Sequence, residues 1–352
     1  MNYIGMDTHI TTLEFAVVNE RGMITRETRI PTGAKTMIEF IRSVPKPRKV
    51  YTEEGSLAAW VVETCLEFGE EVVVTDTKRN RWIGSSEEKL DSIDAKKLAQ
   101  LARGGYVKAI AHPTGDRRRF RELVGSYHDT VISQTRIKNK VKSKFRQNGI
   151  LCTGETVYSE KYRKEWREKL KGEKVSSQII EELWKQLDAT MDSVKRYLRL
   201  MRSESKKYPE VKNFQDLPGV ALVNAATISA ILADPNRFAH KGKVWTYAGL
   251  GMVKRGSGEK IYSNKLNRNF NRRLKCAIKQ SAQVAVSSKD NPFRRHYLEM
   301  TLKNGVLPHR AKLTIARKML ATMYGMWKSG SKYDPAKVKG SSKSTESENS
   351  VR

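Results

Sequence analysis

Acidic residues at four places in the first hundred positions have types and settings that suit metal-dependent cleavage of nucleic acid. These places are Asp7, the neighbouring pair Glu53 and Glu54, Asp91 and Asp94. Carboxylate oxygens bind Mg²⁺, and two such ions can stabilise the attacking and leaving oxygens of a phosphodiester displacement. The pattern therefore predicts a Mg²⁺ site. The alternative is that these carboxylates cap helices or pair with neighbouring Lys and Arg side chains.

Ser257 is a second candidate for chemistry, in the distant stretch YAGLGMVKRGSG. Flanking glycines predict an open loop that exposes its hydroxyl, and the nearby cations Lys254, Arg255 and Lys260 could bind a phosphate beside it. A serine hydroxyl is a weak nucleophile unless a base or metal activates it, and no histidine lies close in sequence. The residues alone leave two interpretations open, an ordinary loop serine and a nucleophile activated from elsewhere.

The elements that must position the acids alternate between strands and helices. We expect strands at residues 3–8, 12–18, 23–30, 49–53 and 72–74, and helices at 34–42 and 58–68. Such alternation predicts an α/β sheet, and a three-strand meander before the first helix is the order of ribonuclease-H-like folds. Asp7 then ends the first strand. Adjacent residues of a strand face opposite ways, so one glutamate of the pair can face Asp7, and the strand end favours Glu53 over Glu54.

Asp91 and Asp94 fall on a predicted helix over residues 87–102. Ser85 and Glu88 have the spacing of a capping box, and two glycines after residue 103 end the helix. Its apolar residues, Leu90, Ile93, Leu98 and Leu101, define one stripe. Asp94 lies inside this stripe and Asp91 on its edge. Two carboxylates three positions apart can reach one point, which suits a shared divalent cation.

The charge of the chain indicates a polyanionic partner. The 352 residues include 67 Lys+Arg and 38 Asp+Glu, a formal net charge of +29. Residues 1–100 hold 14 Lys+Arg and 16 Asp+Glu, a net charge of −2, so the remaining 252 residues carry +31. The slightly acidic N-terminal part, residues 1–100, suits cation binding, and the basic remainder of the chain suits phosphate binding. A basic surface that serves solubility alone is the alternative.

The spacing of the cysteines and the lengths of the apolar stretches indicate the cellular compartment of the chain. Three cysteines, Cys65, Cys152 and Cys276, lie far apart and fit neither a zinc pattern nor a disulfide framework. No stretch is long and apolar enough to span a bilayer, and the start lacks a signal-peptide pattern. We therefore expect a soluble protein of a reducing cytoplasm, with no membrane partner.

The rear of the chain is expected to be largely helical. Two apolar stripes between residues 117 and 208 predict a helical hairpin or coiled coil, either intramolecular or a dimerisation arm. Four cations, Arg268, Arg272, Arg273 and Lys275, begin a basic helix that is expected to contact nucleic acid. We expect four segments: a catalytic α/β domain at 1–115, a helical coiled-coil linker at 116–208, a mainly helical domain with the serine at 209–330, and a disordered tail at 331–352.

Several motifs, in their order along the chain, resemble a known family. These are GMDTH, YTEEGS, KLDSIDAKKLAQL, DLPGV, RFAHKGKVWTYAGL and RGSG. In this order they resemble the DEDD transposases of the insertion-sequence family numbered one hundred and ten, which are related to Piv-type DNA invertases. The resemblance covers roughly residues 1–328. The LDSIDA stretch and the spacing from YAGL to SG are its most specific parts.

The resemblance implies a RuvC-like N-terminal domain, a coiled-coil middle and a C-terminal transposase domain. It implies that Asp7, one of the tandem glutamates, Asp91 and Asp94 bind Mg²⁺, and that Ser257 joins DNA through a phosphoserine. It further implies donor and target DNA as partners, a structured guide RNA encoded by the element, a homo-oligomer (dimer or tetramer), and a prokaryotic, nucleoid-associated protein.

The chain departs from the family pattern at a few positions. The glutamate motif is one residue shorter than usual, Phe270 stands where a glycine is usual, and Lys275 replaces an expected arginine.

The residues leave two rival functions open. One is a RuvC-like Holliday-junction resolvase or nuclease that uses the acids alone, or a DNA invertase. The other is a non-catalytic nucleic-acid-binding protein.

Overall fold

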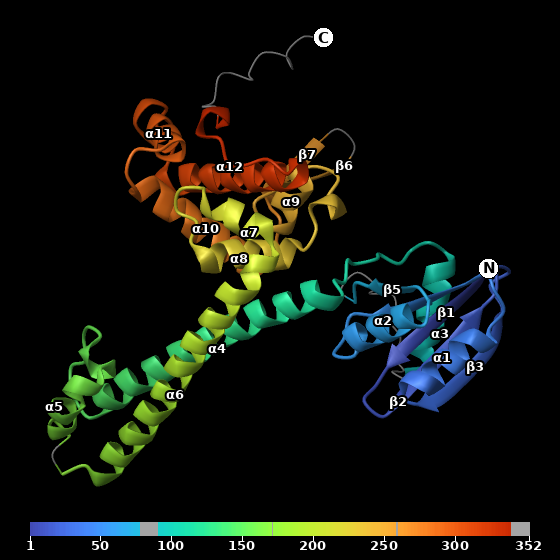
Figure 1. The fold of residues 1–352 in the computed structure, drawn as a ribbon, viewed down its shortest axis with the longest axis horizontal. Coiled ribbons are helices and arrows are strands. Elements are labelled where there is room, and N and C mark those ends of the chain that lie inside the picture. Colours follow the sequence, from blue (N-terminus) through green and yellow to red (C-terminus); the bar gives the residue numbers. More distant parts are fainter. Residues whose placement is uncertain (78–90, 171, 258–259, 339–352) are drawn as a thin grey trace. The chain divides into compact units, whose positions relative to one another are not determined.

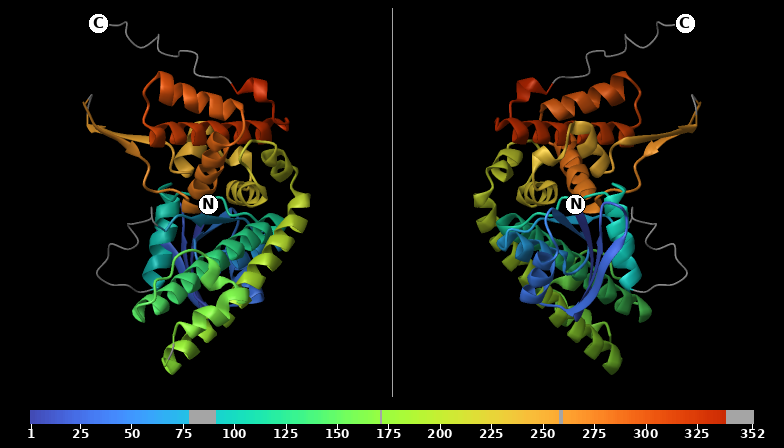
Figure 2. Two further views of the ribbon diagram at one scale, coloured as in Figure 1. Left: turned by 90° about the vertical axis from the view of Figure 1, so that its left-hand side faces the viewer. Right: turned by 90° about the vertical axis from the view of Figure 1, so that its right-hand side faces the viewer.

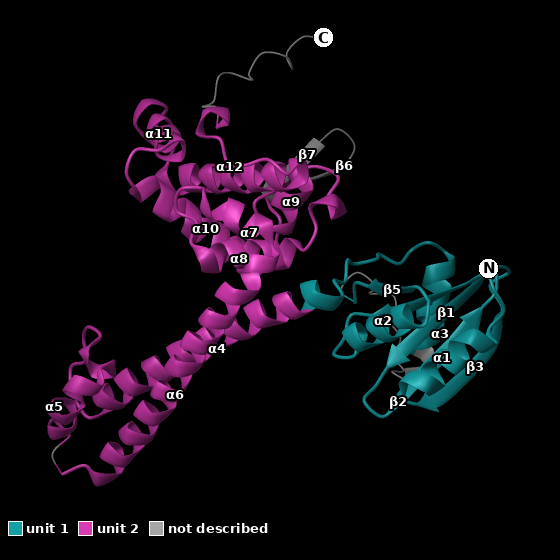
Figure 3. Ribbon diagram, viewed as in Figure 1, with its two compact units in different colours: residues 1–118 teal, residues 119–352 magenta. Residues whose placement is uncertain are grey.

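The computed structural model divides the chain into two compact units, residues 1–118 and 119–352 (Figure 3). The structure describes residues 1–77, 91–170, 172–257 and 260–338; at 91–93, 253–257 and 260–265 it describes the backbone alone. The predicted boundary at residue 115 lies close to this division. The predicted middle and rear domains fall together in the second unit. No helix of the described chain is long and apolar enough to cross a membrane.

The first unit contains a five-stranded mixed sheet with helices on both faces (Figure 1). Its strand order is β3-β2-β1-β4-β5; β1 pairs antiparallel with β2, β2 antiparallel with β3, and β4 runs parallel to both β1 and β5. The elements are β1 (Asn2–Thr8), β2 (Thr12–Val18), β3 (Ile24–Pro31), α1 (Ala34–Ser43), β4 (Arg48–Glu53), α2 (Ala58–Glu67), β5 (Val72–Thr75) and α3 (Asp91–Arg103). The predicted α/β sheet is confirmed, and it is consistent with a RuvC-like domain.

The two faces of the sheet have different partners because side chains alternate along each strand. One face packs against α1 and α2, in a core that includes Ile4 and Met6 of β1 and Met37 and Ile41 of α1. The other face packs against α3, where Tyr51 of β4 meets Leu98. The sheet is therefore a middle layer with α3 alone, among the described helices of this unit, on the second face.

The second unit begins with a pair of long helices. They are α4 (Gly115–Gln147), whose first residues belong to the first unit, and α6 (Lys174–Glu204). The segment between them forms short helices: η2 (Thr156–Tyr158), η3 (Glu160–Tyr162) and α5 (Arg163–Glu168). Phe145, Trp166 and Trp184 pack in a core where this segment meets the two helices. The segment between the two long helices is thus partly a packed cap.

The middle part of the helix pair has no buried residue of its own. In α4 this holds for every residue between Val124 and Val141, and in α6 for every residue between Leu187 and Met201. Val194 and Leu198 of the predicted apolar stripe are half-exposed there, and Leu200 is exposed. A buried stripe is therefore seen at the ends of the hairpin and is absent from these two described ranges.

The rest of the second unit is a helical body around one large core. Its elements are η4 (Ser205–Lys207), α7 (Pro209–Gln215), α8 (Leu222–Leu232), η5 (Pro235–Arg237), α9 (Lys241–Tyr247), β6 (Met252–Ser257), β7 (Lys260–Leu266), α10 (Arg272–Ser287), α11 (Pro292–Leu298), the π-helical η6 (Glu299–Lys303), α12 (Pro308–Ser329) and η7 (Pro335–Lys337). Antiparallel β6 and β7 form a separate two-stranded sheet, which projects from the helices of its unit (Figure 2).

The turn between α7 and α8 is a packing element. A Cβ added to Gly219 would lie 2.4 Å from the carbonyl oxygen of Ser281 and 2.5 Å from the nitrogen of Ala285, so the turn rests on the backbone of α10. Gly219 also has a φ of +79°, a conformation that favours glycine. The glycine of the DLPGV motif is thus needed for the close approach of this turn to α10.

The expectation of a disordered tail from residue 331 is wrong at its beginning. Tyr333 stacks on Phe293 with 6.4 Å between ring centroids, and Val338 packs against the large core. Aromatic and branched side chains bury apolar area that offsets the cost of ordering these residues. Residues 339–352 lie outside the described part of the chain.

Candidate active site

A row of polar residues crosses the sheet of the first unit at the level of Asp7. In the strand register, Arg29 of β3 lies opposite Glu14 of β2, and Glu14 lies opposite Asp7 of β1. The parallel pairing of β1 with β4 runs to Met6 and Thr52, so Glu53 follows beside Asp7. Residues opposite each other in a sheet point to the same face. Asp7, Glu14 and Glu53 are therefore neighbours on one face.

Gly5 identifies this face as the one that α3 covers. A Cβ added to Gly5 would lie 2.1 Å from the carbonyl oxygen of Ala95 and 2.7 Å from the nitrogen of Ala99. The backbones of β1 and α3 are thus in direct contact at this point. Asp7 is two residues further along the strand, so its side chain points to the same side as α3.

The direction of α3 brings its N-terminal end toward Asp7. The Arg103 Nε donates a hydrogen bond of 3.0 Å to the carbonyl oxygen of Glu20, at the turn beside the start of β1. Lys96 forms a 2.8 Å ion pair with Glu27, which is level with Gly5 through the register of β3, β2 and β1. The helix therefore runs antiparallel to β1.

Asp91 and Asp94 start α3 at the level of Asp7. One helical turn of about 5.4 Å separates Asp91 from Ala95, while two strand residues, about 6.6 Å, separate Gly5 from Asp7. The buried face of the helix consists of Ala95, Leu98, Ala99 and Ala102, while Leu101 of the predicted stripe is half-buried. Asp91 and Asp94 lie four positions before Ala95 and Leu98, on the same stripe.

Asp94 is half-buried, and the side chain of Asp91 lies outside the described residues. The predicted helix start at residue 87 and the capping box of Ser85 and Glu88 lie there too. The backbone nevertheless places both aspartates at the end of α3 that comes level with Asp7.

The two glutamates have different surroundings. Glu53 continues the alternation of Tyr51, which packs on α3, so its side chain points toward α3 and Asp7. Glu54 follows the strand: its backbone N–H donates to the carbonyl oxygen of Thr75 at 3.1 Å, and its carboxylate lies 4.0 Å from His112 Nε2. This geometry supports Glu53 as the partner of Asp7.

Two further residues at this site were not predicted from the sequence. Glu14 is a buried carboxylate whose ion pair with Arg29 has a length of 3.0 Å. His9 Nε2 lies 3.0 Å from Asp7 Oδ2, and the backbone N–H of Thr8 donates to the other oxygen of Asp7 at 2.9 Å. The signals were a charged residue within the apolar strand TLEFAVV and a histidine two positions after the aspartate.

The donor set fits a hard divalent cation, although the described side chains do not yet converge. Asp7, Glu53 and Asp94 offer carboxylate oxygens, which Mg²⁺ prefers, from one face of the sheet and the helix above it. Among the described side chains, which exclude Asp91, no group of three or more His, Cys, Asp or Glu residues is close enough to hold a metal. Asp7 would have to turn from His9 to share an ion with its neighbours.

Ser257 is placed at the end of a strand, in contrast to the open loop that its glycines predict. It is the last residue of β6 and pairs with Lys260, the first residue of β7. A register shift between Arg255 and Gly256 interrupts the ladder just before it. Lys254 and Arg255 lie on the same hairpin, and the side chains of all these residues lie outside the described part of the chain.

The basic helix after the hairpin is α10, and its cations have different partners. Arg273 forms an ion pair with Asp129 of α4, so its charge is partly compensated within the unit. Lys275 lies 4.2 Å from the ring centroid of Phe270. A Cβ added to Gly249, in the YAGL stretch, would lie 2.4 Å from that ring. Arg268 lies before α10 and is exposed.

Comparison with known proteins identifies two family regions in the chain. Residues 4–148 match the model of a DEDD transposase of the IS110 type, described as a transposase. Residues 211–298 match the model described as the transposase IS116/IS110/IS902 family. Together the two regions cover more than half of the chain, and they contain the acids and Ser257, respectively.

Curated relatives come from insertion elements. The IS116 uncharacterized 44.8 kDa protein of Streptomyces clavuligerus is 28% identical over 167 residues, 47% of this chain and 41% of that protein. The IS110 uncharacterized 43.6 kDa protein of Streptomyces coelicolor is 28% identical over 118 residues, 34% of this chain and 29% of that protein. The IS900 uncharacterized 42 kDa protein of Mycobacterium paratuberculosis is 24% identical over 166 residues, 47% of this chain and 41% of that protein. The chain thus matches less than half of the length of each of these relatives.

Proposed function

Because the chain belongs to the IS116/IS110/IS902 family of transposases, we propose that it cuts and rejoins DNA as the transposase of an insertion sequence. The observation that supports the proposal is that Asp7, Glu53 and the start of α3 share one face and one end of the sheet, within the region that matches the DEDD model. Donor and target DNA are the proposed substrates.

We propose that Asp7, Glu53, Asp91 and Asp94 hold Mg²⁺. When bound, the cation neutralises the charge that develops on the phosphate and on the leaving oxygen, which contributes several kcal/mol to catalysis. The protein side chains have three tasks here: to bind the ion, to orient the scissile phosphate, and to keep both in place. The close packing of α3 on Gly5 supports the last task, because rigid backbones hold side chains within narrow limits.

We propose that Ser257 is the nucleophile. Its Oγ forms a bond to the phosphorus while the bond from phosphorus to one DNA oxygen breaks. The proton of the serine hydroxyl ends on that released oxygen, so the step is balanced without an oxidant or a reductant. In the second step a DNA hydroxyl attacks the phosphoserine, a new phosphodiester forms, and the serine recovers its proton.

We propose two further partners, a structured guide RNA and additional copies of this chain. The net charge of +31 outside residues 1–100 supports binding of long polyanions. The half-exposed apolar residues of the α4–α6 hairpin, such as Val194 and Leu198, support a contact between subunits in a dimer or tetramer.

A second candidate is a RuvC-like nuclease or resolvase that uses the acids alone. The observation that favours it is that Asp7, Glu53 and α3 all belong to one compact unit. One assay separates it from transposition and from simple binding. The chain is incubated with Mg²⁺ and end-labelled DNA, and products are examined under denaturing conditions. Transposase chemistry predicts a covalent protein–DNA adduct, nuclease chemistry predicts cut DNA without an adduct, and a non-catalytic protein leaves intact DNA.

A further inference from the structure

A groove between α10 and α12 is lined by cations whose charge is not compensated locally. It has a volume of about 810 Å³. Its lining residues are Arg272, Lys275, Cys276, Lys279, Gln280, Gln283, Val284, His309, Lys312 and Leu313, and they include no carboxylate. Within the described part of the chain, Arg272, Lys275, Lys279 and Lys312 form no ion pair with an acid. The groove is therefore a concave surface of uncompensated positive charge, which suits an anion.

The cations are arranged along the groove on two helices in close contact. Arg272, Lys275 and Lys279 are spaced by three and four positions, so they lie on one face of α10. Lys275 and Lys279 are about one turn, or 5.4 Å, apart along the helix axis. From the other side, His309 and Lys312 lie in the first turns of α12, whose N-terminal end carries partial positive charge.

Lys275 is a half-buried member of this set, whereas Arg272 and Lys279 are exposed. The pKa of Lys275 is lowered, first because burial removes water from its ammonium group and second because of the charge of Lys279. The ring of Phe270, 4.2 Å away, holds Lys275 in position. A polyanion that enters the groove would favour the charged form of this lysine.

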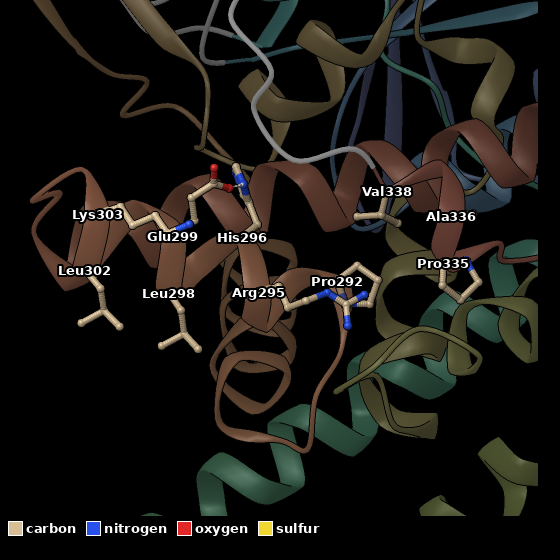
Figure 4. A pocket seen from close by; sticks show the side chains of 10 residues that line it. All are labelled: Pro292, Arg295, His296, Leu298, Glu299, Leu302, Lys303, Pro335, Ala336 and Val338. Atoms are coloured by element: carbon tan, nitrogen blue, oxygen red, sulfur yellow. Dashed lines mark ion pairs between the residues drawn. The ribbon is translucent and has the colours of Figure 1, made fainter.

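Another cavity of the same unit lacks this excess of positive charge, so the excess is not common to all cavities of the unit. That cavity lies between α11, η6 and the segment around η7, and it is lined by both signs of charge (Figure 4). In it Glu299 lies 3.6 Å from the buried His296, beside Arg295 and Lys303. A cavity with its own carboxylate has no comparable need for a polyanion.

We propose that the α10–α12 groove binds the sugar–phosphate backbone of a DNA strand, and this rests on the DNA-rejoining function proposed above. Apolar side chains beside the cations, such as Val284 and Leu313, suit the bases of a single strand. We propose DNA as the occupant because of the position of α10 in the sequence. This helix begins six residues after Leu266, the last residue of the hairpin that bears Ser257. The strand that reacts at the hairpin is the one that this helix can hold.

Cys276 supplies a native probe of the groove. It is exposed and lines the groove, whereas Cys65 and Cys152 are buried. A maleimide is added to the wild-type chain in EDTA, which prevents Mg²⁺-dependent cleavage, with or without a single-stranded DNA of about 16 nucleotides. We expect DNA to slow the labelling of Cys276 at least several-fold. Labelling at an unchanged rate under saturating DNA would overturn the proposal.

Charge removal tests the same groove by equilibrium binding. The double variant Lys279→Gln, Lys312→Gln should lower the log–log salt slope by about 1.4 and raise the Kd about 25-fold near 0.1 M salt, since each single-strand contact contributes about 0.7 to the slope. The matched control is Lys289→Gln, Lys332→Gln, which removes two exposed lysines of the same unit outside the groove. Unchanged melting curves must accompany both variants.

Three outcomes would reject the groove as a DNA site. In the first, the control loses as much affinity as the groove variant. In the second, neither variant changes the salt slope. In the third, an RNA of the same sequence protects Cys276 and the DNA does not, which would assign the groove to RNA. All these readouts are independent of cleavage, so a failure here is distinguishable from a failure of the Ser257 adduct assay.

Discussion

At the scale of single residues, the central feature is a row of acids that strand register places on one face of the sheet. Sequence patterns predicted Asp7, Glu53 and Asp94 because each is an acid at an element end or on an apolar helix face. Glu14 escaped this reasoning because a charged residue in a strand has a ready interpretation as a solvent-facing one. Its burial depends on α3 covering that face, which depends on contacts distant in the sequence.

The register leads to a ranking of the acids. We predict that Asp7→Asn, Asp91→Asn and Asp94→Asn each abolish DNA cleavage while binding survives, because each removes a proposed ligand of a charge-neutralising ion.

Glu53→Gln should reduce cleavage far more than Glu54→Gln, because Glu53 shares the face of Asp7. Rates measured on labelled DNA with Mg²⁺ check this, and a larger effect of Glu54→Gln would mean that the alternation ends before Glu53.

At the scale of elements, the contact between β1 and α3 determines whether the acids can meet. Sequence periodicity predicted both elements, but it could not predict their contact, because the close approach at Gly5 depends on the absence of a side chain there. The sequence also gave no indication that the first part of the tail packs through Tyr333 and Val338. Ser257, in turn, was expected in a loop because glycine is permissive in turns, yet the strand pairing extends to it.

Gly5 offers a direct test of this contact. We predict that Gly5→Ala destabilises the first unit by about 1–3 kcal/mol, because the new methyl group would overlap the carbonyl of Ala95 and overpack the interface. Gly55→Ala is the matched control, since a Cβ there has no neighbour within 4 Å. Denaturant unfolding compares the two variants. Equal stability of both would show that α3 does not press on Gly5.

The junction of α4 with α8 should make the second unit sensitive to acid. His128 Nε2 lies 2.8 Å from Thr227 Oγ1, and its pKa is lowered below the ordinary 6.5 by burial first and then by the charge of Arg273. The folded state thus binds fewer protons than the unfolded state, so stability is complete above about pH 6.5 and falls as the pH drops below it.

We therefore predict that His128→Gln reduces the loss of stability on acidification below pH 6.5. Burial also lowers the pKa of His296. This histidine should account for the dependence of stability on pH that remains in the variant. His309→Gln, at an exposed position, serves as the control. Thermal melts between about pH 7 and pH 5 measure the effect. A slope that His128→Gln leaves unchanged would contradict this account of the junction.

At the scale of the whole molecule, the acids and Ser257 lie in different compact units and in regions that match different family models. The proposed reaction needs both on the same DNA, either from one chain or from two. If the site is built across subunits, inactive Ser257→Ala and Asp94→Asn chains should regain strand exchange when mixed before addition of DNA. Persistent inactivity of well-folded mixtures would favour a site contributed by one chain.

The most direct test of the account is the chemical identity of the protein–DNA link. Wild-type chain is incubated with DNA and Mg²⁺, denatured and digested, and the peptide that carries a nucleotide is sequenced by mass spectrometry. We predict a phosphodiester on Ser257 that forms with Mg²⁺, is lost in EDTA, and is lost again in Ser257→Ala and in Asp94→Asn. An adduct that persists in Ser257→Ala, or one that forms fully without a divalent cation, would contradict the joint action of the carboxylates and the serine.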